Sequence, residues 1–159
     1  MSSEKIHEII KDYQHDYEQR KFEITPDHIQ KWGNQFGENS DFILSELLHF
    51  LPDVYISKEK AKNLLRQRLT DFQEFYKYST MVEFITNTHL FDVQKPEKSQ
   101  GEILEIINNI LQSEFLIDYK ELEQHPKKHF IYFDDILATG GTIFRDLNKW
   151  VDSEENGIQ

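Results

Sequence analysis

Apolar side chains recur every three to four residues through the first 76 positions of the chain, which is the period of an amphipathic α-helix. This pattern predicts four helices: residues 3–21, 25–37, 40–51 and 57–76. The triplet Thr25, Pro26 and Asp27 favours a helix start, because it combines a capping hydroxyl, a proline in the first turn and an acid near the positive end of the helix dipole. Ser40 is expected to cap the next helix, which should end before Pro52. We interpret the apolar faces of these helices as core packing.

From about residue 80 the pattern changes to short apolar runs that are typical of strands. Such runs occur at residues 81–85, 90–93, 115–117 and 129–133. The last run is unbroken, which is typical of a parallel strand buried on both faces. Helices are predicted from Gly101 to about Leu111 and after the Gly140–Gly141 turn. Strands that alternate with helices predict an α/β fold, with an N-terminal helical region (1–79) followed by a partial parallel-sheet core (80–159).

Composition and charge argue against several classes of protein and site. The 159 residues suffice for one domain or two small ones, and a hydrophobic content of 38% with 12 Phe argues against wholesale disorder. The net charge of −11 argues against direct binding of nucleic acid through its phosphates. The absence of Cys excludes disulfides and Cys-zinc sites. Because no long apolar run and no signal-peptide pattern is present, we expect a cytoplasmic protein with no membrane partner.

The chemistry is concentrated in residues 130–142, which read FIYFDDILATGGT. The strand delivers Asp134 and Asp135 at its carboxyl end, where open α/β sheets bind ligands. Gly140 and Gly141 allow successive backbone N–H groups to point into one concavity at a helix N-terminus, which suits a phosphate monoester. The carboxylates would repel phosphate, so they should face hydroxyls or a divalent cation. Together these features predict a sugar-phosphate site.

This segment resembles the phosphoribosyl pyrophosphate-binding motif of type I phosphoribosyltransferases, and every position fits. The resemblance implies that Asp134 and Asp135, the residues to which we assign catalysis, engage the ribose 2′- and 3′-hydroxyls. It implies that the following loop holds the 5′-phosphate through Ala138, Thr139, Gly140, Gly141 and Thr142. It also implies Mg²⁺ as the cofactor, carried by the diphosphate. No side chain is assigned as a metal ligand, because His7 and Glu8 lack the second His that a zincin helix would need at Lys11.

A second segment of that family, the pyrophosphate-binding loop, lies between the first core strand and the next helix. Here the corresponding place holds Lys98, Ser99 and Gly101, whose ammonium, hydroxyl and backbone N–H groups could hold pyrophosphate. A solvated loop before an ordinary helix start explains the same residues about equally well. Both interpretations stay open at this point.

Two departures from the family matter. The flexible hood that shields the reacting centre would fall at residues 119–128, which is a short stretch with no obvious hood. The family core also continues with further strands, so we expect either a fragment of a longer protein or a sheet completed by a partner, in a homo-oligomer or with another protein. The helical extension and the aromatic strand before the acids resemble phosphoribosyltransferase-like proteins of bacterial conflict systems, including retron systems, which implies antiviral defence.

The sequence therefore supports three functions. The first is a phosphoribosyltransferase, a glycosyltransferase that displaces pyrophosphate from Mg-bound phosphoribosyl pyrophosphate with a nitrogen nucleophile. The second is a non-catalytic module that binds a phosphoribosyl group or nucleotide, or an effector subunit of a bacterial defence complex. The third is an interaction scaffold in which the helical half does the work. The resemblance alone does not decide whether the protein is an enzyme.

Overall fold

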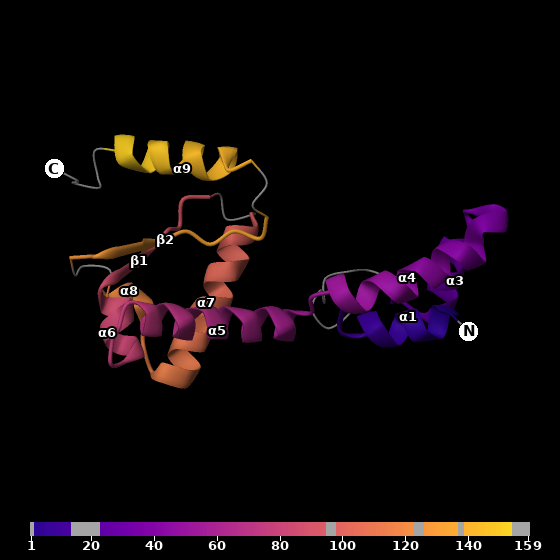
Figure 1. Ribbon diagram of the computed structural model, residues 1–159, viewed down its shortest axis with the longest axis horizontal. Coiled ribbons are helices and arrows are strands. Elements are labelled where there is room, and N and C mark those ends of the chain that lie inside the picture. The colour runs from indigo at the N-terminus through magenta and orange to yellow at the C-terminus, as the bar shows by residue number, and fades with distance from the viewer. Residues whose placement is uncertain (1, 14–22, 95–97, 123–125, 137–138, 154–159) are drawn as a thin grey trace. The chain divides into compact units, whose positions relative to one another are not determined.

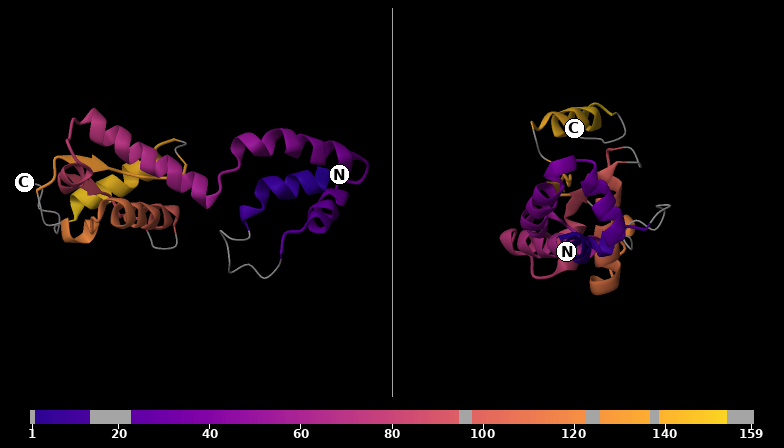
Figure 2. Two further views of the ribbon diagram at one scale, coloured as in Figure 1. Left: turned by 90° about the horizontal axis from the view of Figure 1, so that it is seen from below. Right: turned by 90° about the vertical axis from the view of Figure 1, so that its right-hand side faces the viewer.

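The structure is a computed structural model that describes residues 2–13, 23–94, 98–122, 126–136 and 139–153 (Figure 1, Figure 2). The chain forms two compact units, Met1–Ala61 and Lys62–Gln159, each with a hydrophobic core of its own. The division lies within one helix, upstream of the change of pattern near residue 79. The expected domains 1–79 and 80–159 stay a prediction.

The first unit is helical. Its elements are α1 (Ser2–Ile10), α3 (Pro26–Asn34), the short 3₁₀-helix η1 (Gly37–Asn39) and α4 (Ser40–Val54). One residue from each α-helix is buried at the centre of its core, namely Ile6, Ile29 and Leu44. Packing is close here, because a β-carbon at Gly33 would lie 3.0 Å from the Leu44 side chain.

Helix starts in this unit agree with the sequence better than helix ends. Thr25 caps α3 as predicted, and its hydroxyl accepts a hydrogen bond from the His28 backbone N–H at 3.2 Å. Ser40 is the first residue of α4 and its side chain makes no capping bond, so this part of the prediction was wrong. The expected stop before Pro52 was also wrong, because α4 continues through it to Val54. The predicted residues 14–21 of the first helix lie outside the described residues.

The second unit combines helices with a small parallel sheet. Its elements are α5 (Lys58–Phe75, which begins in the first unit), α6 (Met81–Thr86), β1 (Thr88–Leu90), α7 (Ser99–Phe115), α8 (Tyr119–Leu122), β2 (His129–Ile131) and α9 (Gly141–Asp152). The strands pair in parallel, from Thr88 opposite His129 to Leu90 opposite Ile131. A helical region followed by a partial parallel-sheet core is the predicted fold class, and it is confirmed.

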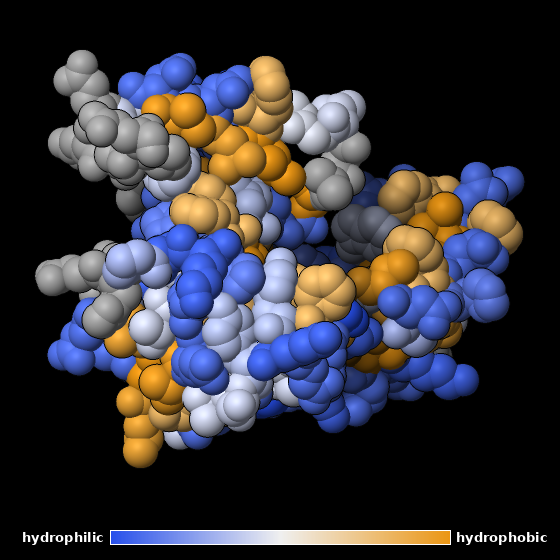
Figure 3. Space-filling model, turned by 60° about the vertical axis from the view of Figure 1, so that its left-hand side comes forward, coloured by the Kyte–Doolittle hydropathy of each residue, from blue (hydrophilic) through white to orange (hydrophobic). Residues whose placement is uncertain are grey.

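The two faces of the sheet are covered differently (Figure 1). On one face, helices α5 to α8 enclose a core whose central side chains, Leu69, Phe84 and Ile110, are fully buried. On the other face lies α9, whose Trp150 ring is 5.0 Å from that of Phe91 and 5.9 Å from that of Phe130. No residue of α9 is fully buried. Figure 3 shows hydrophobic surface over this part of the second unit, where Phe144 and Val151 are exposed.

Three predictions about strands were wrong. Residues 81–85 form helix α6, because the Thr80 side chain caps it by accepting from the Glu83 backbone N–H at 3.1 Å. Residues 115–117 are not a strand, because Phe115 is the last residue of α7 and Leu116 is its C-cap in a left-handed conformation with φ of 57°. The motif strand β2 is not buried on both faces, since the Phe130 side chain is 50% exposed. No helix within the described ranges is long and apolar enough to cross a membrane.

Candidate functional site

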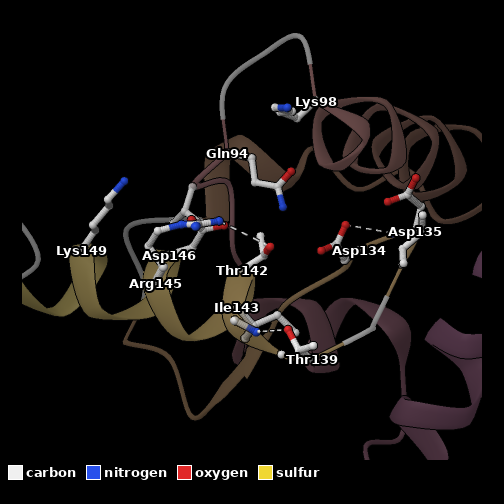
Figure 4. A pocket seen from close by; sticks show the side chains of 14 residues that line it. Gln94, Lys98, Asp134, Asp135, Thr139, Thr142, Ile143, Arg145, Asp146 and Lys149 are labelled. Atoms are coloured by element: carbon white, nitrogen blue, oxygen red, sulfur yellow. Dashed lines mark hydrogen bonds between the residues drawn. The ribbon is translucent and has the colours of Figure 1, made fainter.

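A pocket of about 470 Å³ lies at the carboxyl ends of the two parallel strands (Figure 4). Three segments build it: the residues after β1, the segment from β2 to the start of α9, and one side of α9. Its lining consists of Val93, Gln94, Lys98, Asp134, Asp135, Ile136, Thr139, Gly140, Gly141, Thr142, Ile143, Arg145, Asp146 and Lys149. The pocket therefore occupies the edge at which parallel sheets bind ligands.

The Gly140–Gly141 turn lines this pocket at the start of α9. Gly140 is the N-cap residue with φ of +74°, a left-handed conformation that favours glycine. A β-carbon at Gly140 would meet no atom within 4 Å, so backbone conformation, and not space, requires glycine there. At Gly141 the nearest atom would be the Thr139 hydroxyl oxygen at 3.4 Å, an ordinary contact. The backbone N–H of Gly141 donates weakly to the same oxygen, also at 3.4 Å, which leaves the loop open to an incoming acceptor.

The acidic pair has two different environments. The Asp135 backbone N–H donates to Oδ1 of Asp134 at 3.0 Å, while the Ser99 hydroxyl donates to Oδ1 of Asp135 at 2.8 Å. Burial, and then the neighbouring Asp135, raises the pKa of Asp134 above its usual value. The hydrogen bond from Ser99 lowers the pKa of Asp135. Asp135 is thus the carboxylate that stays ionised more readily, and Asp134 is the one that takes a proton first.

Gln100 links the segments that carry the pocket residues. Its side chain is fully buried, and its Oε1 accepts from the backbone N–H groups of Val93 and Gln94, both at 3.0 Å. Its Nε2 donates to the backbone carbonyl of Phe133 at 3.2 Å. One amide therefore joins the segment after β1, the first turn of α7 and the residue before the acidic pair. A buried amide with three hydrogen bonds helps to fix the positions of the segments that it links.

Tyr132 hydrogen-bonds to a third carboxylate of the pocket, that of Asp146. Its hydroxyl donates to Oδ2 of Asp146 at 2.8 Å and accepts from Nε2 of Gln94 at 2.7 Å. Burial, ahead of the effect of the nearby Asp146, raises the pKa of Tyr132, so the phenol stays a neutral donor. The Asp146 carboxylate, which lines the pocket, is therefore hydrogen-bonded to a neutral phenol.

Three cationic side chains line the same pocket, namely Lys98, Arg145 and Lys149. Nη2 of Arg145 lies 3.4 Å from Oγ1 of Thr142. Among the described residues, no carboxylate forms an ion pair with any of the three. Arg145, Lys149 and their neighbour Asp146 were not among the residues predicted from the sequence. Their spacing of three, four and seven positions after Thr142 was the signal, because such positions share one side of a helix.

The structure brings most of the predicted site residues together. The carboxyl pair Asp134 and Asp135, the loop residues from Thr139 to Thr142, and Lys98 line one pocket. Ser99 joins them through its bond to Asp135. Gly101 does not line this pocket and lies instead on a smaller cavity beside Tyr119. Ala138 lies outside the described residues. In the described part of the chain, no group of three or more potential metal ligands occurs.

An acidic pair and a Gly-Gly loop before a helix thus line one pocket at the carboxyl edge of the parallel sheet, as the resemblance to phosphoribosyltransferases implies. The sequence matches the PRTase-CE family over residues 29–159, which is most of the chain, and the protein belongs to that family. No curated protein and no solved structure showed a significant match.

Proposed function

We propose that the pocket binds phosphoribosyl pyrophosphate and that the protein transfers its ribosyl phosphate to a nitrogen acceptor. The observation that carries this proposal is that the Thr139–Thr142 loop and the Asp134–Asp135 pair, which are chemically complementary to a phosphate and to a diol, line one pocket. Membership of a phosphoribosyltransferase-like family supports the same class of ligand.

Hydrogen-bonding character and charge predict where each end of the ligand binds. A 5′-phosphate accepts hydrogen bonds, so it belongs at the loop, where the backbone N–H of Gly141 and the hydroxyls of Thr139 and Thr142 are available. The ribose hydroxyls donate hydrogen bonds, so they belong at Asp135, whose low pKa keeps it an acceptor. Lys98, at the N-cap of α7, would face the diphosphate on C1. This arrangement gives the ligand one orientation.

The site is compatible with Mg²⁺ that arrives with the ligand. Mg²⁺ is commonly held by one or two carboxylates together with substrate phosphates and waters, and not by an all-protein cage. Asp134 and Asp135 are the carboxylates that fit this role, and the described residues contain no larger ligand cluster. When bound, Mg²⁺ would neutralise charge on the departing diphosphate.

In the proposed reaction, the C1–oxygen bond to pyrophosphate breaks and a bond from C1 to the acceptor nitrogen forms, while the nitrogen loses its proton to solvent. Positive charge develops on the ribose in such a displacement. Asp135, held ionised by Ser99, would stabilise that charge and orient the ring. Catalysis would rest on positioning and electrostatics.

Calorimetric titration of Asp135→Asn with Mg-phosphoribosyl pyrophosphate tests this proposal. Loss of the ionised acceptor should weaken binding by about 1–3 kcal/mol, the range for a charged hydrogen bond. Asp152→Asn, which removes the same charge from the end of α9 outside the pocket, should bind as the wild type does. Equal affinities in all three proteins would contradict the ribose assignment.

The second candidate, a non-catalytic binding module or an effector subunit of a bacterial defence complex, is favoured by a separate observation. Asp135 and Ile136 are exposed at the pocket. Tyr119, in the described part of the predicted hood segment, is bound to β1 and not to the pocket, because its hydroxyl accepts from the backbone N–H of Leu90 and donates to the carbonyl of Leu90. Pyrophosphate release with a panel of nitrogen bases distinguishes the two candidates. Ligand binding without any release would support the module.

A further inference from the structure

The adjacent carboxylates of the pocket and its two α9 cations lie at different ends (Figure 4), and the carboxylate of Asp146 lies beside the cations. The carboxylates Asp134 and Asp135 lie at one end, the phosphate loop with Thr142 lies between, and the side chains of Arg145 and Lys149 lie at the other end. A ribose 5′-phosphate occupies only the first two of these regions. The third region is cationic and lies beyond the place of the 5′-phosphate.

The cationic end continues directly from the phosphate loop. Thr142, Arg145 and Lys149 follow one side of α9 at helical spacing, and Lys149 lies about 10 Å along the axis from Thr142. Because Nη2 of Arg145 is 3.4 Å from the Thr142 hydroxyl oxygen, a group that extends from the loop along α9 meets the guanidinium first. Lys149 follows about one helical turn after Arg145 on α9.

These two cations keep their charge available although the chain carries a net charge of −11. Asp146 is the acidic neighbour between them on α9, and its Oδ2 accepts the hydrogen bond from the Tyr132 hydroxyl. No ion pair joins Arg145 or Lys149 to a carboxylate in the parts of the chain that the structure describes. Two cations without an ion pair among the described residues, with one hydrogen-bonded carboxylate between them, line a pocket of an acidic protein, and this arrangement favours the binding of an anion.

We propose that Arg145 and Lys149 form a second anion subsite, which binds the β-phosphoryl group of a ribose 5′-diphosphate. The ligand class is a nucleoside 5′-diphosphate, with its diol at the acidic pair and its α-phosphate at the loop. This inference rests on the proposed ribose-phosphate site and extends it. Phosphoribosyl pyrophosphate, with its single 5′-phosphate, leaves the second subsite empty.

Titration of the full chain with AMP and ADP tests the inference, because these ligands differ only in the β-phosphoryl group. Buffer without divalent cations keeps the charge of the ligand unmasked. We expect ADP to bind at least about tenfold more tightly than AMP, the factor associated with one charged hydrogen bond. Arg145→Ala and Lys149→Ala should each remove most of this preference, and Lys149→Ala, whose position is about two helical turns from Thr142, should change AMP affinity by less than about twofold. Both side chains are exposed, so the fold tolerates their loss.

Arg68→Ala is the matched control, since Arg68 is an exposed cation of α5 in the same unit and does not line the pocket. It should keep the full preference for ADP. Equal binding of AMP and ADP by the wild type, or equal loss of both ligands in the variants, would overturn this inference and leave the proposed function intact. If the wild type binds neither nucleotide, nor ribose 5-phosphate with Mg²⁺, the proposed function fails and the second subsite fails with it.

Discussion

The side-chain amide of Gln100 donates to the backbone carbonyl of Phe133 at 3.2 Å, so the first turn of α7 holds the residue that precedes the acidic pair. The same side chain accepts from two backbone N–H groups that follow β1. The position of Asp134 and Asp135 thus depends on a residue that has no direct role in the pocket. No sequence signal distinguishes Gln100 from other polar residues near a helix start.

Replacing this buried amide is expected to be costly. Gln100→Leu would leave two N–H groups and one carbonyl without partners, and each lost partner of this kind costs about 1–3 kcal/mol. We expect a net loss of about 3 kcal/mol in the free energy of unfolding, measured by urea denaturation. Gln112→Leu, on an exposed position of the same helix, should change it by less than about 0.5 kcal/mol. Similar stabilities of the two variants would contradict the linking role of Gln100.

The two carboxyls should respond to pH with opposite signs. Asp134 has a raised pKa in the folded state, so its ionisation opposes folding above that pKa, and this effect disappears as the pH falls to the unfolded value near 4. Asp134→Asn keeps an acceptor for the Asp135 N–H and removes the charge. We therefore expect thermal unfolding at a higher temperature than the wild type at pH 7 and at the same temperature near pH 3.

Asp135→Asn provides the opposite case. The pKa of Asp135 is lowered, so its ionised form stabilises the fold above the unfolded pKa, and this contribution is lost as the pH falls through the folded pKa. The variant should be less stable than the wild type at pH 7, with the difference vanishing at low pH. If both variants shift stability in the same direction at pH 7, the assigned environments of the two acids are wrong.

Truncation tests the division into two units. Helix α5 contributes Leu69, which is fully buried in the core of the second unit, and Phe72 packs against the same core. A chain of residues 57–159 keeps this helix and should stay soluble, fold cooperatively and retain ribose-phosphate binding. A chain of residues 80–159 loses it and should be insoluble. A soluble, ligand-competent 80–159 chain would show that α5 is dispensable to the sheet unit.

The sequence predicted the candidate site of the second unit better than the elements that support it. Residues 129–142 show their roles locally, because a strand, two acids and a Gly-Gly turn follow one another. By contrast, the apolar run at residues 81–85 has strand composition, and only the pairing of Thr80 with Glu83 reveals a helix start. In the structure, Glu83 Oε2 accepts from the Ser79 N–H at 3.2 Å while Thr80 caps the helix.

Other features depend on packing and have no local signal. Leu116 adopts a left-handed conformation at the end of α7 without the glycine that usually marks such a position, and the Ile117 N–H donates back to the Leu111 carbonyl at 3.1 Å. The contributions of Arg145 and Lys149 depend on which side of α9 faces the pocket. Periodicity predicted the helix, but the orientation of the helix is set by Trp150 against the sheet.

The two glycines of the proposed phosphate loop, Gly140 and Gly141, have different conformational requirements. Gly140 has a positive φ, so Gly140→Ala should cost about 1–2 kcal/mol in stability with or without ligand. At Gly141 a β-carbon makes only an ordinary contact, 3.4 Å from the Thr139 hydroxyl oxygen. A β-carbon at Gly141 is therefore compatible with the free fold, and it would obstruct a phosphate that approaches the backbone.

Thermal unfolding of the wild type and of Gly141→Val, each with and without Mg-phosphoribosyl pyrophosphate or ribose 5-phosphate, tests the phosphate site most directly. Ligand at about 100 times its dissociation constant should stabilise the wild type by about 2.7 kcal/mol through mass action. We predict this shift for the wild type and none for Gly141→Val, whose free form should unfold at nearly the wild-type temperature. A full ligand-induced shift in Gly141→Val, or no shift in the wild type with either ligand, would contradict the assignment of the Thr139–Thr142 loop as the phosphate site.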